Sequence, residues 1–426
     1  MEKRFSKGKH STVPFFTALA IYTTSFDIVG VINLGSVTIR CTQLFTLPIL
    51  IIWILNTIYR QKWKAPIAWK WLLIWIAMQF AFIFRSPNIK NALGYYLWLI
   101  FNVCVVFSTV DNCGKYYSFK WLYKTYINSI YVNAVIGLIQ FVLFPIGINF
   151  FVTQNWTNKL ARINGFTFEP SYFGTYLLPG FVILSYLKNS LLLGKKELKT
   201  INRQLLIICI AMILSSSRMC WLMIAVWEIF TLLRDIGITS AHYDGKIKKK
   251  RYVRDIILII LIVCGIIFVN YMLSKRSNSF LLAGLGIKGG DAHSTSERMA
   301  GLLSCLYIFR NSPWLGYGLG GVDPMIAQVR GVPFSILGNG AAMSIIGETL
   351  VANGLVGIFP FAIYITKIIK RNKSDSVFVK AFKNALVFEL LILCFNQNIL
   401  RPYVWWLIAI CSASRLINHV RNQNEH

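Results

Sequence analysis

The sequence predicts an all-α, polytopic integral membrane protein in which residues 1–426 form a single transmembrane domain. Composition is the first observation: 56% of the residues are hydrophobic and 14% are charged, whereas about a quarter of the residues in soluble domains are charged. The second is a succession of apolar runs close to the ~20 residues that cross a bilayer core. The third is that basic residues gather in short segments between these runs.

The apolar runs predict about twelve transmembrane helices. Each run is bounded by charged or turn-forming residues, and the two runs beside Arg218 are short, which suggests helices that tilt or lie only partly in lipid. In chain order, the expected spans cover residues 13–33, 44–59, 69–85, 92–110, 125–146, 171–191, 204–217, 219–233, 256–274, 347–369, 383–400 and 403–418.

Charge placement predicts the orientation of these spans. With both termini cytoplasmic, most of the 44 Lys and Arg residues fall in inner loops, as the positive-inside rule requires. The clearest inner marker is the basic run at 248–251. The first apolar stretch contains Asp27 and lacks a small-residue cleavage pattern, so we expect no cleavable signal peptide. The inner segments are 1–12, 60–70, 111–124, 188–203, 234–254, 367–383 and the C-terminal tail.

The net charge of +28 does not indicate a nucleic-acid-binding protein. The basic residues form no continuous stripe on a soluble domain. They lie in short loops, where anionic lipids of the inner leaflet attract them. We therefore expect membrane lipids as partners and no nucleic acid.

Metal and nucleotide motifs are missing from the sequence. The nine cysteines are scattered without a CxxC pair, and the five histidines show no HExxH spacing, so we expect no metal site and no cofactor. The glycine-rich segment 316–321 lacks the Gly-Lys-Ser/Thr ending of a phosphate-binding loop. We expect it to be a flexible turn.

Two outer segments are long enough to carry structure between spans. The first covers residues 147–170, and the second covers residues 275–346. Within the second, apolar positions at 297–309 recur at helical spacing, which predicts a helix that lies on the membrane surface or caps a cavity. No long cytoplasmic domain is present to bind a soluble activated sugar. Any chemistry therefore belongs on the outer face.

Lone arginines lie at the outer ends of several spans, whereas most basic residues of the chain lie in the inner loops. An arginine at such a position is unfavourable unless an anion neutralises it. We expect a lipid-linked pyrophosphate to be that anion. The arginines concerned are Arg40, Arg85, Arg162, Arg218, Arg298 and Arg401.

The segment 162–174 carries the densest group of polar residues. Pro170 suits the first turn of a helix, which places Glu169 at the N-terminus, where the helix dipole favours its ionised form. A turn at Asn164-Gly165 could bring Arg162 and Glu169 together. They would form either a salt bridge that pins the loop or an anion and sugar site. Tyr172 could stack on a sugar ring or belong to an interfacial aromatic belt.

Three serines precede Arg218 between two apolar runs. Arg218 is either an interfacial arginine whose guanidinium group extends to the aqueous phase or a bidentate ligand for phosphate oxygens. In the second case Ser217 and its neighbours add hydroxyl donors. Arg298, in a Ser-Glu-Arg sequence, has similar alternatives: a cap at the start of a helix or an anion ligand.

Three acids lie within or at the ends of expected spans. Glu348 is near the outer boundary, and a carboxylate there suggests a functional site. Asp27 and Glu389 are either functional or packing groups satisfied by Ser, Asn or Arg.

The order of these motifs resembles the O-antigen polymerase and O-antigen ligase superfamily of membrane sugar transferases. An Arg-x-x-Gly-Phe segment leads to Glu-Pro-Ser before a span, and Ser-Arg follows a short span. A long outer loop then carries Ser-x-Arg and AsnSerProTrpLeuGlyTyrGlyLeuGly, and a helix with Glu and AsnGlyLeuValGly comes last. The resemblance covers residues 160–360 by motif and the whole chain by topology.

The resemblance implies a GT-C-like glycosyltransferase of the bacterial inner membrane with its active site on the outer face. The donor would be an oligosaccharide on undecaprenyl diphosphate, bound by Arg162, Arg218 and Arg298, and a chain-length regulator protein is a further possible partner. The ligase branch carries a histidine-asparagine pair where Gly338 and Asn339 stand here. This departure favours a polymerase of O-antigen, capsule or exopolysaccharide repeat units and leaves Asn339 as a substrate-binding candidate.

The expected reaction is a metal-independent inverting transfer between two lipid-linked chains. Arg218 and Arg298 would stabilise the leaving diphosphate. Glu348 or Glu169 would be the base, with Glu348 preferred because an acid at the membrane boundary is harder to explain structurally. The alternatives are a ligase that uses another acceptor and, from a different class, a flippase for the same lipid. Against the flippase, we find no internal repeat and no paired broken helices in the sequence.

Overall fold

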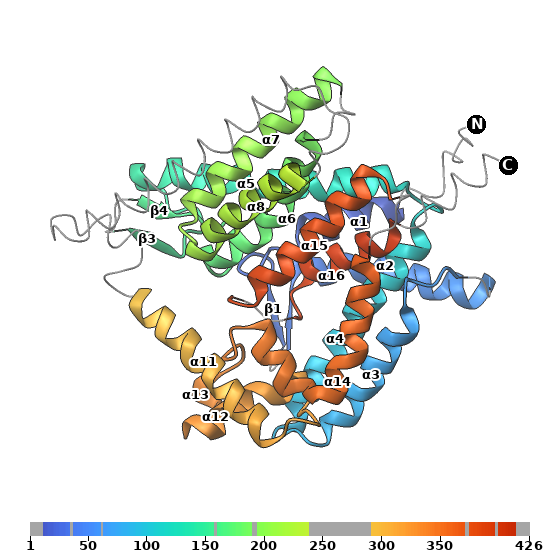
Figure 1. Ribbon diagram of the computed structural model, residues 1–426, viewed down its shortest axis with the longest axis vertical. Helices are drawn as coiled ribbons and strands as arrows, with labels where there is room; N and C mark the ends of the chain where they lie inside the picture. The colour runs from blue at the N-terminus through green and yellow to red at the C-terminus, as the bar shows by residue number, and fades with distance from the viewer. Residues whose placement is uncertain are drawn as a thin grey trace.

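The computed structural model of the chain describes residues 12–34, 37–60, 63–156, 160–189, 194–237, 291–370, 375–396 and 399–414. Helices dominate these residues, and the only strands among them form two short hairpins (Figure 1). The expectation of an all-α fold is confirmed. The expected span 256–274 and the basic run 248–251 lie outside the described residues.

The first half of the chain supplies a bundle of helices with two hairpins inserted. Its elements are α1 (Thr12–Tyr22), β1 (Ile32–Leu34), β2 (Val37–Ile39), α2 (Cys41–Arg60), α3 (Trp69–Ile83), α4 (Ile89–Asn112), α5 (Phe119–Leu143), η1 (Phe144–Ile146), β3 (Gln154–Trp156), β4 (Leu160–Arg162), α6 (Pro170–Lys188), α7 (Lys195–Leu214) and α8 (Arg218–Gly237).

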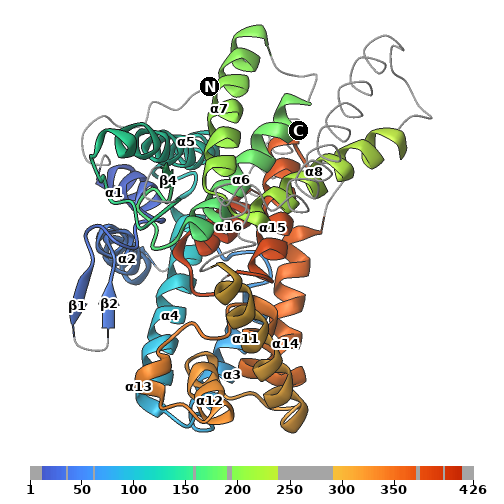
Figure 2. The ribbon, with the colours of Figure 1, turned by 90° about the vertical axis from the view of Figure 1, so that its left-hand side faces the viewer.

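The second half continues the bundle and adds a group of shorter helices at one end (Figure 2). The helix expected over 297–309 is part of the first of these elements. They are α11 (Asp291–Asn311), η2 (Leu319–Gly321), α12 (Val322–Arg330), α13 (Phe334–Leu337), α14 (Ile345–Ile369), α15 (Val377–Leu393) and α16 (Pro402–Ala413).

Several helices have the length and apolar composition of membrane spans. Among the described residues there are four such helices, at Cys41–Tyr59, Ile89–Asn112, Phe119–Ile146 and Ile345–Ile369. Shorter apolar helices cover Thr12–Tyr22, Trp69–Ile83 and Pro402–Ala413. The chain is thus a helical membrane protein by the length and composition of its helices.

The first expected span, 13–33, is only half helical. Helix α1 ends at Tyr22, where the hydroxyl of Thr23 donates to the Leu19 carbonyl oxygen at 2.8 Å and that of Thr24 donates to the Ile21 carbonyl oxygen at 2.9 Å. Hydroxyl groups that bond to the preceding turn compete with helix continuation. The chain then forms the antiparallel hairpin β1–β2, in which Ile32 faces Ile39.

Helices α6 and α16 lie at the centre of the protein. Every residue of α16 is buried and nearly every residue of α6 is buried, as expected for helices that are apolar on all sides. Helix α6 packs on α15 and α7, and α16 packs on α4. Both α6 and α16 begin at a proline, which fits the first helical turn because its N–H needs no partner there. The start of α6 is therefore fixed inside the bundle.

Helix α14 is broken at Gly354, whose φ of 59° and ψ of −175° lie outside the helical region. A break in an apolar helix is tolerated when other groups satisfy the freed backbone. Here segment 313–318 does so. The four hydrogen bonds are Leu355 N to Pro313 O at 2.8 Å, Val356 N to Trp314 O at 3.2 Å, Tyr317 N to Val351 O at 3.1 Å and Gly318 N to Ala352 O at 3.0 Å.

The glycine-rich segment 316–321 is consequently not a flexible turn, and that prediction is wrong. A Cβ at Gly316 would lie 1.9 Å from the Ala352 carbonyl oxygen, so only glycine allows this approach. The Asn353 side chain beside the break accepts hydrogen bonds from Trp75 and Gln79. Segment 313–318, which we call the plug, therefore fills the break in α14 with its own backbone hydrogen bonds.

Candidate functional site

A pocket of about 340 Å³ lies where the start of α6, the α7–α8 junction, α11 and the ends of α14 and α15 meet. Arg162, Arg218 and Arg298 all line it. They come from three different parts of the chain, and no Asp or Glu is among the described residues that line the pocket. The structure thus brings the three arginines that were expected to bind diphosphate around one cavity, which we call the arginine pocket.

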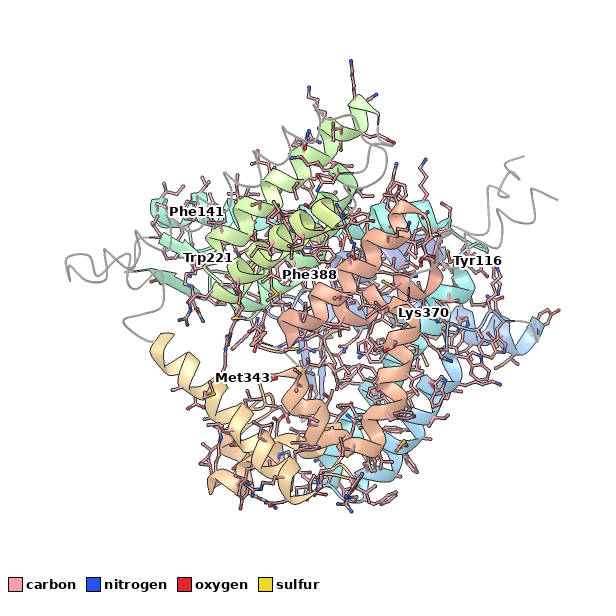
Figure 3. All side chains as sticks on the ribbon, in the orientation of Figure 1. Tyr116, Phe141, Trp221, Met343, Lys370 and Phe388 are labelled. Carbon is pink, nitrogen blue, oxygen red and sulfur yellow. The ribbon has the colours of Figure 1, made fainter. Side chains whose placement is uncertain are left out.

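The rest of the arginine pocket is divided between hydroxyl groups and apolar side chains. Ser171, Ser217 and Ser344 contribute hydroxyls, whereas methionine, leucine and phenylalanine side chains form an apolar wall. In Figure 3, Met343 lies just before the start of α14, on the side of that segment toward α11. The apolar residues are Met219, Met299, Leu302, Met343 and Phe395.

Arg218 is the first residue of α8, and Ser217 caps that helix. The Ser217 Oγ accepts a hydrogen bond from Cys220 N at 3.4 Å, the pattern of an N-cap residue. The pocket therefore receives the positive end of the α8 dipole together with the Arg218 guanidinium. A helix N-terminus and a forked cation are each suited to phosphate oxygens.

Backbone strain is concentrated at this pocket. Ser216 has a φ of 55° and Met343 a φ of 47°, two of the four non-glycine residues with positive φ in the described chain. Both line the pocket. Non-glycine residues in this region cost about 1–3 kcal/mol and cluster at functional sites. The strain supports a ligand-binding role for the pocket independently of its charge.

Arg298 on α11 meets the start of α6. Its Nη2 lies 3.9 Å from the Glu169 Oε2 and 3.4 Å from the Ser171 Oγ. Ser171 in turn donates to the Glu169 carboxylate at 3.0 Å. Glu169 is thus at the rim of the pocket, with 30% of its side chain exposed.

Arg162 is placed by the hairpin β3–β4 inside the expected outer loop 147–170. Its Nη1 donates to the Gln154 side chain on the paired strand at 2.9 Å, and its Nη2 donates to the Ser216 carbonyl oxygen at 3.5 Å. These contacts tie the hairpin to the strained turn before α8. The pocket is therefore assembled by both the first outer loop and the α7–α8 junction.

Two other arginines already have an anionic partner within the protein. Asp27 lies 2.9 Å from the Arg40 Nε, and both of its oxygens accept from the Arg401 Nη1 at 3.1 Å. Burial alone would lower the pKa of Arg401, but Asp27 raises it above its ordinary value. The expectation that Arg40 and Arg401 bind lipid pyrophosphate is wrong. Tyr172 stacks on Arg401 at 4.4 Å and is not among the residues that line the arginine pocket.

Arg85 also has a structural role. It donates to the Gly316 carbonyl oxygen at 3.0 Å and to the Ser312 hydroxyl at 3.1 Å, and it stacks on Tyr317. These contacts hold the plug that fills the break in α14. Arg85 is not among the described residues that line the arginine pocket.

Glu348 and Asn339 have structural contacts of their own. Glu348 is 4% exposed, and its Oε2 accepts a hydrogen bond from the Ile399 backbone at 2.9 Å. That contact gives an acid at the membrane boundary a structural explanation. Asn339 accepts from the Asn91 side chain at 3.2 Å. Neither residue is among those lining the pocket.

Asn396 does not line the arginine pocket but contacts Ser171, which does, and the sequence did not indicate this residue. Its amide donates to the Ser171 carbonyl oxygen and to the Thr175 hydroxyl, each at 2.9 Å. These two contacts join the end of α15 to the first turn of α6.

No protein-family model, no curated protein sequence and no solved structure matches this chain. Among the described residues, no group of three or more His, Cys, Asp or Glu side chains is placed to hold a metal ion.

Proposed function

We propose that the protein polymerises surface polysaccharide repeat units by transferring a glycan from undecaprenyl diphosphate to the sugar of a second lipid-linked unit. It does so in the bacterial inner membrane, with a GT-C-like arrangement of about twelve spans, cytoplasmic termini and its site on the outer face. A chain-length regulator is its expected protein partner. The observation that carries this proposal is the arginine pocket, which joins three guanidinium groups and a helix N-terminus to an apolar wall.

The two sides of the pocket suit the two parts of a lipid diphosphate. Three positive side chains match the charge of a diphosphate, and guanidinium groups bind its oxygens in pairs. The methionine, leucine and phenylalanine side chains give the first carbons of a lipid tail an apolar contact. A volume of about 340 Å³ holds the diphosphate and its immediate neighbours, while the glycan and the rest of the tail extend outside.

In the proposed reaction, the acceptor hydroxyl oxygen attacks the anomeric carbon of the donor sugar. A new glycosidic bond forms, the bond from this carbon to the diphosphate oxygen breaks, and the anomeric configuration inverts. The electron pair leaves with the diphosphate. Arg218 and Arg298 stabilise that charge, each contributing about 3 kcal/mol by comparison with oxyanion donors. The acceptor proton passes to a carboxylate.

Glu169 is the carboxylate that we assign as this base. It is partly exposed and lies 3.9 Å from Arg298 at the pocket rim, whereas Glu348 is buried and holds the Ile399 backbone. A general base must reach the proton that it removes. The sequence-based preference for Glu348 is therefore replaced by Glu169.

Glu169→Gln should lower turnover by ~10²–10⁴ while donor binding is retained, because the amide keeps the shape of the side chain but accepts no proton. The measurement is the initial rate of glycan extension by purified protein at saturating donor. The matched control is Glu348→Gln, which should lower thermal stability and leave turnover per folded molecule nearly unchanged. If Glu348→Gln loses turnover and Glu169→Gln does not, Glu348 is the base. If both variants polymerise normally, the reaction uses no carboxylate base.

Arginine side chains take the role that metal ions have in many other phosphate-leaving reactions. We therefore expect the purified protein to keep its full activity in excess EDTA. The measurement is extension of a lipid-linked repeat unit before and after chelation, with a metal-dependent transferase in the same buffer as the control. Activity that disappears with EDTA and returns with Mg²⁺ or Mn²⁺ would contradict the assignment of charge stabilisation to arginine.

A further inference from the structure

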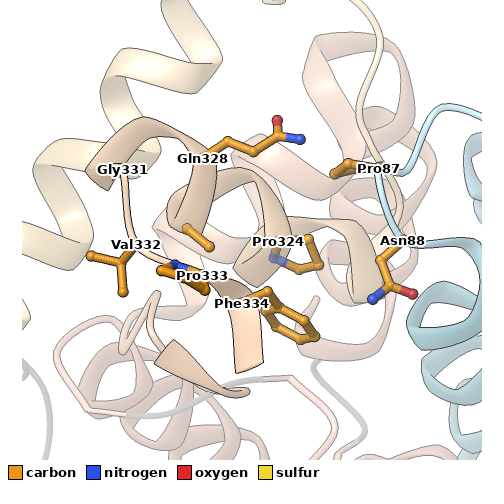
Figure 4. Close-up of a pocket in the computed structure, with 9 residues that line it drawn as sticks. Pro87, Asn88, Pro324, Gln328, Gly331, Val332, Pro333 and Phe334 are labelled. Atoms are coloured by element: carbon orange, nitrogen blue, oxygen red, sulfur yellow. The ribbon is translucent and has the colours of Figure 1, made fainter. Parts of the chain in front are cut away.

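Two adjoining surface pockets lie over α12, on the group of short helices. One, of about 380 Å³, is lined by Pro87, Asn88, Pro324, Gln328 and Phe334, among others (Figure 4). The other, of about 530 Å³, is lined by Tyr307, Met325, Gln328 and Val329. Gln328 lines both, so the two pockets adjoin at this residue, and together we call them the α12 groove. It shares no lining residue with the arginine pocket.

The α12 groove has the opposite electrostatic character to the arginine pocket. In a chain of net charge +28, the described residues that line the groove include no Lys, Arg, Asp or Glu. A phosphate or an acidic sugar therefore meets no charged side chain in the lining of the groove. The groove suits a neutral ligand.

The neutral side chains of the groove combine aromatic rings and amides. Phe334 lines one pocket and Tyr307, 57% exposed, lines the other. Asn88 uses its Oδ1 to accept from Asn91 N at 3.0 Å, and its amide nitrogen is turned to the Phe334 side in Figure 4. Gln328 adds a second amide, which carries both donors and an acceptor. Sugar rings present apolar C–H faces and hydroxyl groups, which match aromatic rings and amides respectively.

The walls of the groove are held rigidly. Pro87, Pro324 and Pro333 fix the backbone on its sides, because the proline ring restricts φ. Below them, the Asp323 carboxylate accepts from Gly340 N at 2.7 Å and from Ala341 N at 2.9 Å. Rigid walls reduce the entropy lost when a ligand binds. The groove is therefore formed before any ligand arrives.

We propose that the α12 groove binds a neutral segment of the glycan, outside the arginine pocket, and holds the growing chain there between transfers. The identity of that glycan as polymer rests on the proposed function, but binding of a neutral saccharide does not. Two aromatic side chains at separate pockets allow a chain of several sugars, not one residue, to be held.

Binding is tested with purified, detergent-solubilised protein on an array of neutral and uronic-acid-containing oligosaccharides. The wild type should bind neutral glycans. The double variant Phe334→Ala/Tyr307→Ala should bind them about tenfold more weakly, since aromatic contacts contribute about 1.5 kcal/mol. Ile336→Ala, a 73% exposed position outside the groove, should bind like the wild type. Arg218→Lys should also retain this binding, and unfolding temperatures show whether each variant is folded.

A second readout separates the groove from the chemistry. When the wild type extends lipid-linked repeat units, the double variant should still make the first bond but should give a shorter modal chain length. If the wild type extends no repeat units, the proposed function is refuted. The binding measured on the array still shows whether the groove binds a neutral saccharide. The inference is overturned if the wild type binds no neutral glycan or only acidic ones, or if the folded double variant binds like the wild type.

Discussion

Arg218→Lys is expected to reduce polymer formation by ~10²–10³, the loss that follows removal of one preorganised donor to a developing negative charge. Lysine keeps the charge but has no planar fork, so it cannot hold two diphosphate oxygens at once. The capping contact of Ser217 with Cys220 N does not involve the Arg218 side chain. The variant should therefore remain folded and inserted.

The measurement is the amount of polymer formed per folded molecule, with protein level and unfolding temperature recorded together. The matched control is Arg310→Lys, an exposed position on α11 that is outside the arginine pocket. That control should polymerise like the wild type. Normal polymer from Arg218→Lys would remove this arginine from the mechanism.

Gly316→Ala is expected to destabilise the fold by about 3 kcal/mol, the upper end of the range for overpacking. The added Cβ would lie 1.9 Å from the Ala352 carbonyl oxygen and 2.4 Å from Asn353 N. Both are backbone atoms, so no side chain can move aside. The plug would have to withdraw, and the backbone groups freed by the break at Gly354 would lose their partners inside an apolar helix.

Thermal unfolding of the purified protein measures this effect. Gly94→Ala is the matched control, because Gly94 lies within α4 and an added Cβ there meets no atom within 4 Å. That control should be as stable as the wild type or slightly more stable, since alanine favours helix. If Gly316→Ala unfolds at the wild-type temperature, the plug does not support α14.

The sequence predicted the elements that depend on local chemistry. Pro170 correctly indicated the start of a helix, and apolar periodicity indicated the helix at 297–309. Of the six arginines that the sequence singled out, the family resemblance indicated Arg162, Arg218 and Arg298. The structure places these three around one pocket, and their role there stays a prediction.

The features that the sequence could not predict depend on contacts between distant segments. Asp27 neutralises Arg401, 374 residues away, so neither needs an external partner. Glu348 was preferred as the base because its contact with Ile399 cannot be seen in a linear motif. The positive φ of Met343 also has no residue-type marker, because it is imposed by packing and not by glycine or asparagine.

The same limit applies to the glycine-rich segment. Its composition is typical of a turn, but its glycines are required by close packing of Gly316 against the broken α14. The break in α14 is also not by itself a sign of function. A broken span suggests a transporter site when its backbone lines a cavity, whereas segment 313–318 fills this break with hydrogen bonds. The broken helix therefore gives no support to a flippase.

Extension of a lipid-linked repeat unit by the purified protein in vesicles is the most direct test of the account. The substrate is a single repeat unit on undecaprenyl diphosphate, supplied on the outer face, and the products are separated by size. We expect a ladder of new glycosidic linkages with undecaprenyl diphosphate released, and no ladder from Arg218→Lys. A substrate that is moved across the membrane or transferred once to a different acceptor, with no chain longer than one repeat unit, would contradict it.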